Sequence, residues 1–532
     1  MVNKFSYIVD NFRIGFEDKE RLNELLCEYL SIEKEVLVEL TVLKESLDAR
    51  QHKINIFYQH RIRFNLTTPL KEKPKNVSEV DQIQLPNEEG VPTNFKKHKR
   101  PLVVGYGPAG MFLAFTLIEA GIKPIIIEKG QTGVERQKSI NQLWKNSILD
   151  ENSNVQFGEG GAGFFSDGKL GTRVKSSLIQ DVYKIFVRFG AKEEILYQSK
   201  PHLGTDKLRI ILKSFRTYLI EQGATFQFQK TVEKIKLKNK RVIGVTLDDG
   251  AFIEADDVFL CTGHSCRDIY RMLHANNVSM ESKEFAVGFR VEHPQEFINK
   301  SQFGHFFDNS LLPAADYKLT TQSKKSKQGV YSFCMCPGGM VVLATSEKNK
   351  IVTNGMSLSH RDGKLANAGI VVAVNKEFLE PDLFAGIRFQ EEIEAKAYSM
   401  TNSYFAPAQR IQDFMDNQVS TDLPKSSFLP GLKSCNLRQL YPEWITEKIL
   451  AAVKVFEEKF PGFIHADGIF IAPETRTSSP IKILRNPETY ESINTIGLYP
   501  LGEGAGASGG ITSSAIEGIH GARKWIKKYS NI

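Results

Sequence analysis

Apolar positions between residues 102 and 128 follow a strand–helix–strand pattern. Residues 102–104 form a short apolar run, and a second run at 125–127 ends at an acidic residue. Between them, apolar side chains recur at helical spacing, at Met111, Leu113, Ala114, Leu117 and Ile118. The pattern predicts a buried strand, a helix that ends at a glycine, and a second buried strand in one unit.

A glycine turn joins the first strand to the helix in this unit. The sequence GYGPAG matches the G-x-G-x-x-G spacing, whose glycines allow a sharp turn, a close approach of the backbone to a pyrophosphate, and tight helix–strand packing. The helix N-terminus favours phosphate, and the acid after the second strand is placed to bond an adenosine ribose. The unit therefore predicts dinucleotide binding, with contacts at Gly105, Gly107, Pro108, Ala109, Gly110, Glu128 and Lys129.

A second glycine-rich turn follows a strand predicted at residues 495–501 and precedes a helix predicted to end at Trp525. Only about one helix follows the turn, so a second complete dinucleotide-binding unit does not fit. The turn resembles the C-terminal half of two-part flavoproteins, in which an acid, here Glu503, holds the ribityl chain. The alternative is a capping turn without a ligand. The predicted contacts are Gly502, Glu503, Gly504, Gly509, Gly510 and Ile511.

Short strands are predicted between these two turns, at residues 225–228, 232–235, 241–247 and 251–253, followed by a buried strand at 258–260. In the same class of flavoproteins, a strand that ends in a small residue, Thr and Gly closes the FAD domain near the pyrophosphate. An ordinary sheet strand is the alternative. The predicted contacts are Val232, Thr262 and Gly263.

The loop GEGGAG at residues 158–163 also matches G-x-G-x-x-G, but the FFSDG that follows does not begin an apolar helix. We interpret it as a flexible loop that contacts a flavin, the alternative being a mobile surface loop. Its predicted contacts are Gly160, Gly161, Gly163 and Ser166. Arg136 could reach a phosphate or lie solvated on a helix surface.

Six stretches together resemble the bacterial family of uncharacterised FAD-dependent dehydrogenases, which are NAD(P)/FAD-dependent oxidoreductase-like proteins with a two-part FAD domain. The stretches are residues 46–50, 105–110, 157–170, 331–339, 474–480 and 502–510. They span nearly the whole chain. The resemblance implies FAD as the cofactor and specifies no substrate.

The predicted fold class is α/β, with a Rossmann-like FAD/NAD(P)-binding domain, an inserted α+β substrate domain and a small N-terminal α+β domain. The predicted boundaries are an N-terminal domain at 1–66, a linker at 67–97, the FAD domain at 98–284 and 485–532, and the insertion at 285–484. In the N-terminal domain we expect a helix at 22–30 and strands at 36–43 and 54–64. Ser46, Asp48 and Arg50 form either a docking turn or a strand-ending loop held by its own hydrogen bonds.

The inserted domain carries the candidates for substrate chemistry. They are Arg290, His360, Arg361, Glu474 and Arg476, each of which could instead be a structural salt-bridge residue. Arginine suits a carboxylate or phosphate because its planar fork bonds two oxygens. Cys334 and Cys336 are interpreted as buried packing thiols, since residues i and i+2 of a regular strand are too far apart for an unstrained disulfide. No metal site is predicted.

The composition is that of a large enzyme, with 532 residues, 41% hydrophobic residues and a formal net charge of +7. Six cysteines make no disulfide framework, and the first residues show no secretory apolar region, so we expect a cytoplasmic protein. Nucleic acid is not indicated, and the expected partner is a small molecule. The predicted function is hydride transfer between an organic substrate and noncovalent FAD, with NAD(P)H as a transient donor. The alternatives are a tRNA-modifying or other nucleic-acid-acting enzyme, and a flavin-binding redox sensor.

Overall fold

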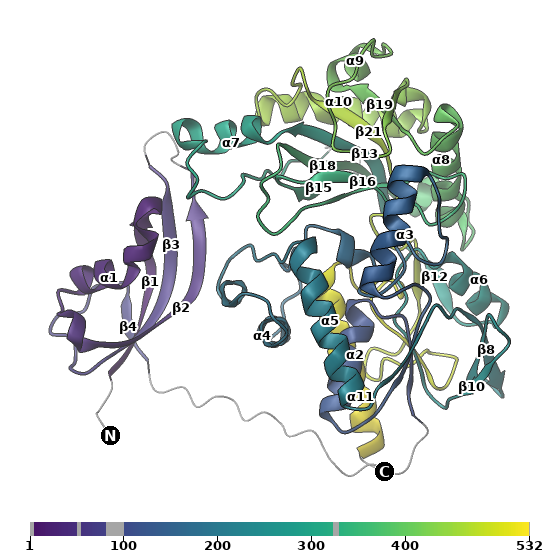
Figure 1. The fold of residues 1–532 in the computed structure, drawn as a ribbon, viewed down its shortest axis with the longest axis horizontal. Helices are drawn as coiled ribbons and strands as arrows, with labels where there is room; N and C mark the ends of the chain where they lie inside the picture. The colour runs from purple at the N-terminus through teal and green to yellow at the C-terminus, as the bar shows by residue number, and fades with distance from the viewer. Residues whose placement is uncertain (1–4, 51–54, 81–99, 323–328, 531–532) are drawn as a thin grey trace.

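The computed structural model describes residues 5–50, 55–80, 100–322 and 329–530. Its N-terminal unit is a four-stranded antiparallel sheet in the order β2-β3-β1-β4, with helix α1 packed against it (Figure 1). Tyr7, Val9, Leu26 and Phe64 lie in its buried core. The elements are β1 (Phe5–Gly15), α1 (Leu22–Leu30), β2 (Leu37–Asp48), β3 (Phe57–Leu66) and β4 (Val77–Glu79).

The N-terminal unit extends beyond the predicted boundary at residue 66. Strand β4 pairs with β1, with Val77 opposite Val9, so the first part of the predicted linker belongs to the sheet. The rest of that linker, from residue 81, and residue 54 of the predicted strand lie outside the described residues. At the end of β2, Arg50 Nε donates to Asp48 Oδ1 at 2.8 Å. Of the two interpretations of this turn, the structure therefore shows the strand-ending loop held by its own hydrogen bonds.

A five-stranded parallel sheet in the order β23-β11-β5-β6-β7 forms the second unit, with helices α2, α5 and α11 together beside it (Figure 1). Its strands come from both parts of the predicted FAD domain. The last helix runs to Ser530, beyond the predicted end at Trp525. The elements are β5 (Leu102–Val104), α2 (Pro108–Glu119), β6 (Ile125–Glu128), α3 (Gly133–Asn146), α4 (Leu178–Arg188), α5 (Thr205–Glu221), β7 (Thr225–Phe228), β11 (Val258–Leu260), α6 (Arg267–Ala275), β23 (Leu498–Pro500) and α11 (Ile511–Ser530).

A small antiparallel sheet, β10-β9-β8, is inserted between β7 and β11. Its strands are β8 (Val232–Lys238), β9 (Arg241–Leu247) and β10 (Phe252–Glu254), close to the predicted ranges. Seven short 3-10 helices connect other elements of the described chain, at Phe16–Arg21, Lys34–Val36, Ala162–Phe165, Glu193–Leu196, Gly304–Phe306, Lys376–Phe378 and Leu437–Gln439.

The third unit is built on a seven-stranded sheet in the order β14-β15-β18-β13-β21-β19-β20, antiparallel except for the pair β19–β20. The chain enters and leaves it beside the paired strands β12 (Met280–Ser282) and β22 (Ile481–Ile483). The sheet strands are β13 (Phe285–Pro294), β14 (Thr320–Gln322), β15 (Gly329–Cys336), β18 (Leu365–Val374), β19 (Ala406–Arg410), β20 (Leu432–Ser434) and β21 (Ile469–Glu474). The hairpin β16 (Met340–Leu343) and β17 (Thr353–Met356) and helices α7 (Gln295–Phe303), α8 (Ala385–Thr401), α9 (Ile411–Asp416) and α10 (Glu443–Lys459) complete it.

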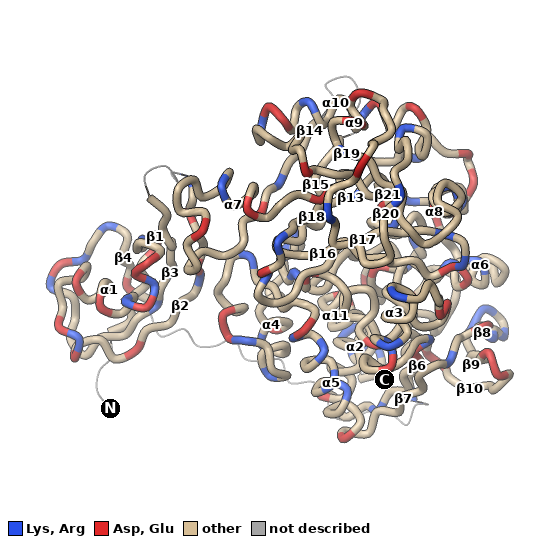
Figure 2. Tube along the Cα trace, turned by 45° about the horizontal axis from the view of Figure 1, so that its top comes forward, with Lys and Arg blue, Asp and Glu red and all other residues tan. Residues whose placement is uncertain are grey.

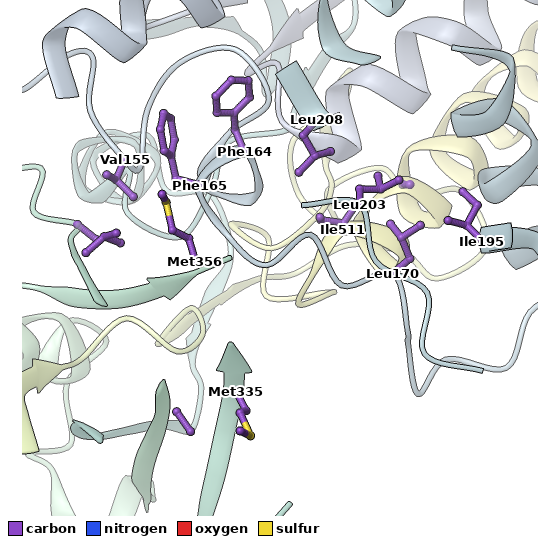
Figure 3. Packing of buried hydrophobic residues seen from close by; sticks show 14 of the residues in the cluster. Val155, Phe164, Phe165, Leu170, Ile195, Leu203, Leu208, Met335, Met356 and Ile511 are labelled. Carbon is purple, nitrogen blue, oxygen red and sulfur yellow. The ribbon is translucent and has the colours of Figure 1, made fainter. Parts of the chain in front are cut away.

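The loop at residues 157–170 packs into the hydrophobic core rather than lying loose on the surface. Phe164, Phe165 and Leu170 are at most 1% exposed. Leu170 lies near Leu203 and Ile511, and Phe165 lies near Val155 and Met356 (Figure 3). The flexible loop predicted from its glycines, and the alternative of a mobile surface loop, are therefore wrong. Buried phenylalanines fix this backbone beside the ends of the parallel strands.

Candidate functional site

A cavity of about 430 Å³ lies at the carboxyl ends of the parallel strands, where ligands bind in open α/β sheets. It is formed by the βα turn after β5, the acid after β6, the 157–170 loop, the turn after β11 and the start of α11. The residues predicted as contacts that line it are Gly105, Gly107, Pro108, Ala109, Glu128, Lys129, Gly161, Gly163, Ser166, Val232, Thr262, Gly263, Glu503, Gly509, Gly510 and Ile511.

The glycine turn has the geometry that a pyrophosphate cradle requires. Gly105 has φ +98°, and a Cβ there would lie 2.7 Å from the carbonyl oxygen of Cys261. At Gly110, a Cβ would lie 2.1 Å from the Gly105 carbonyl oxygen, so this glycine allows the helix to pack against the strand without itself lining the cavity. Gly107 caps α2 with no side-chain cap, which leaves N-terminal N–H groups of the helix free for an anion.

The Glu128 carboxylate is buried at the end of β6. It accepts hydrogen bonds from the backbone N–H groups of Tyr106 at 2.8 Å and of Gly130 and Gly158 at 2.9 Å each. A carboxylate has about four lone-pair sites, so one site remains for a ribose hydroxyl. The same three bonds bring the glycine turn and the 157–170 loop together around the cavity.

Arg136 was predicted either to reach a phosphate or to lie solvated on a helix surface, and the structure shows neither position. The side chain is fully buried and donates to the carbonyl oxygens of Asn154 at 2.9 Å, Val155 at 2.9 Å and Glu159 at 2.7 Å. Its guanidinium also lies over the ring of Phe165. Arg136 therefore holds the chain before the glycine-rich loop in place, and it neither reaches the cavity nor lies in solvent.

Three further glycines predicted as contacts lie behind the cavity wall. Gly160 has φ +82°, and a Cβ there would lie 2.4 Å from Leu212. At Gly504, a Cβ would lie 2.1 Å from the carbonyl oxygen of Thr262. Gly502 has φ +75°, and a Cβ there would lie 2.8 Å from the Cβ of Ala109. All three allow close packing of the elements that form the cavity, and none of them is among its lining residues.

Glu503 points into the cavity beside a histidine that the sequence analysis missed. Its Oε1 atom lies 3.3 Å from Nδ1 of His264, which is buried. Within the described part of the chain, neither ring nitrogen of His264 makes a hydrogen bond. A buried polar ring that lines a cavity and makes no hydrogen bond to the described residues fits a site built for a polar ligand. The signal was present in the sequence, because His264 directly follows the predicted contacts Thr262 and Gly263.

Two of the candidate catalytic residues form a buried ion pair beneath the cavity. Arg290 Nη1 lies 2.9 Å from both carboxylate oxygens of Glu474, and Arg290 Nε donates to Asn367 at 2.7 Å. Burial raises the pKa of Glu474 to about 7, although the guanidinium of Arg290 opposes that shift. Neither side chain lines the cavity, so their predicted direct contact with a substrate is wrong.

Arg476 does line the cavity, but its guanidinium is held by protein groups. It donates to both carboxylate oxygens of Glu394, at 3.0 and 2.9 Å, and to Ser346 at 2.6 Å. Arg267 binds the same carboxylate at 2.9 and 3.0 Å. Burial opposes ionisation of Glu394, yet the two arginines hold its pKa well below the ordinary value. Arg476 is thus a fixed positive charge in the cavity wall.

The last two candidates lie outside the cavity. His360 is exposed. Its neighbour Arg361 donates from Nε to Oδ1 of Asp167 at 2.9 Å and makes a second bond to Oδ2. Asp167 is buried and lines the cavity, and Arg361 lowers its pKa against the effect of burial. Asp167 belongs to the stretch at residues 157–170, and its sequence position predicted no role for it.

The interpretation of both Cys334 and Cys336 as packing thiols is wrong for Cys334. Cys336 is fully buried, whereas Cys334 is partly exposed and lines the cavity. The reason is an irregularity in β15, where the pairing register with β18 shifts between Phe333 and Cys336. A regular alternation, which the sequence pattern suggested, would have placed both side chains on one face.

A second cavity, of about 580 Å³, adjoins the first on the side of the inserted domain. The two share Lys169, Phe333 and Cys334 as lining residues. Arg173 and Lys318 also line the second cavity and are exposed. Its wall therefore carries positive charge beside the apolar and aromatic residues of β15.

Metal-binding groups and membrane-spanning helices would indicate other classes of function. No group of three or more His, Cys, Asp or Glu side chains among the described residues is arranged to hold a metal ion. None of the helices in the same part of the chain combines the length and apolarity needed to cross a membrane.

The comparisons with known proteins agree with the cavity. Residues 284–477 match a family model described as FAD-dependent protein, C-terminal domain-like. An uncharacterized protein of Clostridium beijerinckii is 40% identical over 534 residues, with 98% of each chain covered. The fold and the site define a FAD-dependent protein, and the chemistry that FAD supplies is hydride and electron transfer. The chain belongs to the family of FAD-dependent proteins, and FAD is its cofactor.

Similar solved structures include glycine oxidase from Bacillus cereus, at 12% identity, with 81% of this chain and 98% of that chain covered and a TM-score of 0.33. L-Amino acid deaminase from Proteus myxofaciens is 10% identical, with 83% and 92% covered and a TM-score of 0.34. CtdE in complex with FAD is 12% identical, with 82% and 85% covered and a TM-score of 0.32. Similarity at these TM-scores carries no argument about a substrate.

Proposed function

We propose that the protein exchanges hydride between a small organic anion and noncovalent FAD. The observation that carries this proposal is that the two cavities adjoin and share the lining residues Lys169, Phe333 and Cys334. The first cavity has a dinucleotide-binding turn in its wall, and the second is lined by basic residues. When bound, FAD supplies a two-electron centre that accepts or donates hydride.

The residues of the first cavity suit the successive parts of FAD. The free site on the Glu128 carboxylate suits the adenosine ribose, and the N-terminus of α2 at Gly107 suits the pyrophosphate. Glu503 and the neighbouring His264 ring, whose nitrogens make no hydrogen bond to the described residues, suit the ribityl hydroxyls. The isoalloxazine ring would then be held at the other end of the cavity, which Cys334 lines.

The second cavity determines the proposed class of substrate. Lys169, Arg173 and Lys318 give it positive charge on the path to the flavin end of the first cavity. A carboxylate or phosphate would be attracted by these groups, and an arginine could bond two of its oxygens. Along the described chain, Lys and Arg are interspersed with Asp and Glu (Figure 2).

We further propose that the protein works in the cytoplasm and that NAD(P)H can reduce its flavin transiently. A reducing compartment agrees with six cysteines that are all free. The proposed domain organisation keeps the FAD domain in two parts around the insertion, with the N-terminal unit extended to include β4.

The test is anaerobic mixing of the purified holoenzyme with NADH, NADPH and a panel of carboxylates and phosphates, followed at the flavin absorbance. We expect at least one organic anion to reduce the flavin or reoxidise the reduced form. Arg173→Ala should raise the KM for that anion by about 10- to 100-fold, the effect of losing one charged hydrogen bond. Lys175→Ala is the matched control, because Lys175 is exposed on the same loop and lines neither cavity.

Two outcomes would contradict the proposal. If only neutral compounds exchange electrons with the flavin, or if Arg173→Ala and Lys175→Ala behave alike, the anion site is wrong. If FAD is bound and no compound turns over, the protein is a redox sensor rather than an enzyme.

A further inference from the structure

The strand that separates the two cavities carries a backbone irregularity at a cysteine. In β15, Phe333 pairs with Gly369 and Cys336 pairs with Asn367, so two residues, Cys334 and Met335, stand opposite one. This is the arrangement of a β-bulge. Cys334 has φ +43°, in the left-handed region that a residue with a side chain rarely adopts. Such strain persists where the surrounding structure holds it and is concentrated at functional sites.

The bulge changes the relation between Cys334 and Cys336. In a regular strand, a rise of about 3.3 Å per residue separates the Cβ atoms of residues i and i+2 by about 6.6 Å. A disulfide requires Cβ atoms about 3.5 to 4.5 Å apart, so a regular strand excludes it. With Cys334 in the left-handed region, the thiol of Cys336 instead turns back onto residue 334, and its Sγ lies 3.4 Å from the Cys334 carbonyl oxygen.

Buried Arg290 holds the strained backbone in place. Its Nη2 donates to the carbonyl oxygen of Cys334 at 2.6 Å and to Sγ of Cys336 at 3.4 Å. Glu474 fixes the other end of the guanidinium. The two candidate residues that do not touch the cavity therefore position the two cysteines that lie next to it.

The two thiols differ in environment and in acidity. Cys336 is fully buried, whereas Cys334 lines both cavities. A hydrogen bond from Cys336 lowers the pKa of Cys334 to about 5, with Lys169 and Arg290 acting in the same direction against burial. The same contact and burial raise the pKa of Cys336 well above its ordinary value. The contact between the two cysteines therefore favours ionisation of Cys334 and opposes ionisation of Cys336.

We propose that Cys334 and Cys336 form a redox-active dithiol–disulfide pair that exchanges two electrons with the FAD. The inference rests on the FAD site of the proposed function. It adds a second two-electron centre to that site, reachable from the second cavity through Cys334. It also gives the bulge, the left-handed residue and the buried Arg290–Glu474 pair a common role.

The exchange balances in electrons and protons. In the oxidising direction, the S–S bond forms between the Cys334 thiolate and Cys336, and the S–H bond of Cys336 breaks. Two electrons and that one proton pass to oxidised FAD, which becomes the singly protonated anionic hydroquinone. In the opposite direction, reduced FAD returns both electrons and the proton, and the S–S bond breaks. No other oxidant or reductant is needed.

The test counts thiols and electrons in the wild-type holoenzyme. The protein is oxidised with ferricyanide, desalted and denatured, and its thiols are titrated with a disulfide reagent. We expect two fewer thiols than the six of the reduced chain, and a peptide carrying Cys334 and Cys336 that is lighter by two hydrogens. Anaerobic titration of the oxidised holoenzyme with dithionite should consume about four electrons per FAD, two for each centre.

Serine variants separate the pair from the flavin. Cys336→Ser should retain FAD, because Cys336 does not line the cavity, and should consume only about two electrons per FAD. Cys435→Ser is the matched control, because Cys435 is buried far from this strand and lies beside Met400. It should still consume about four electrons per FAD. The wild-type thiol count requires no variant, so the test stands if a serine variant fails to fold.

Six titratable thiols after oxidation, or a disulfide that takes no electrons from reduced FAD, would overturn the inference. Either result could occur with FAD bound and the flavin fully active, so the proposed function would survive. A purified chain with no affinity for FAD would refute the proposed function itself, and with it electron exchange between the pair and FAD.

Discussion

Replacing Gly107 with valine should abolish tight FAD binding without unfolding the protein. Gly107 has φ −82°, which any residue adopts. A Cβ at this position would lie 3.7 Å from the nearest atom, Cα of Gly161, an ordinary van der Waals distance. The extra side chain can therefore be accommodated in the apoprotein, but it projects where the pyrophosphate approaches the start of α2.

The magnitude follows from the contacts that the phosphates would lose. Displacing them from about two N–H donors removes two charged hydrogen bonds at about 1.5 to 3 kcal/mol each, or about 3 to 6 kcal/mol. At 1.4 kcal/mol per tenfold change, the Kd for FAD should rise by about 10²- to 10⁴-fold. Because Gly107 is the N-cap of α2, where valine is less favourable than glycine, the free energy of unfolding of the apoprotein should fall by about 1 kcal/mol.

The assay is titration of apoprotein with FAD, followed by the change in flavin fluorescence, beside urea unfolding of the same apoprotein. Gly110→Ala is an informative comparison, because its Cβ would lie 2.1 Å from the Gly105 carbonyl oxygen. We expect that variant to lose about 1 to 3 kcal/mol of stability from overpacking. A folded Gly107→Val protein with the wild-type Kd for FAD would show that the turn does not bind the pyrophosphate.

Three further predictions concern single side chains. Glu503→Ala should weaken FAD binding by about 10- to 100-fold and Glu503→Asp by less, and equal Kd values for wild type and Glu503→Ala would refute a ribityl contact. Arg136→Met should lower the free energy of unfolding by about 3 kcal/mol or more, because it leaves buried carbonyl oxygens unpaired, and urea unfolding measures this. Because the pKa of Cys334 is lowered to about 5, its thiolate should persist as the pH falls from 8 until it is protonated near pH 5. Alkylation of Cys334 by iodoacetamide, read by peptide mass spectrometry, should therefore persist to about pH 5, and a rate that already falls near the ordinary thiol pKa of about 8.5 would contradict this.

The apolar pattern was sufficient to predict the parallel sheet. The runs at 102–104, 225–228 and 258–260 became β5, β7 and β11 with the same bounds. The strands β5 and β11 are buried, continuous apolar segments, whereas β7 has alternating apolar residues and is not buried. Helices α4 and α5 were not assigned, although both bury one apolar face.

The site was predicted in part, and the misses have physical causes. Residues on the glycine turns line the cavity because local backbone geometry places them there. Arg136 was misjudged because its partners come from a loop that folds back over α3, which no local pattern reveals. Cys334 was misjudged because a bulge interrupts the strand alternation. His264 was missed because the absence of hydrogen bonds to its two ring nitrogens appears only once the chain is folded.

The most direct test of the account is a crystal structure of the holoenzyme with FAD bound. We predict the adenosine ribose within hydrogen-bond distance of Glu128, the pyrophosphate at the N-terminus of α2, and the isoalloxazine ring beside Cys334 at the opening to the second cavity. FAD bound in the reverse direction, or with its ring away from Cys334, would contradict the proposed site.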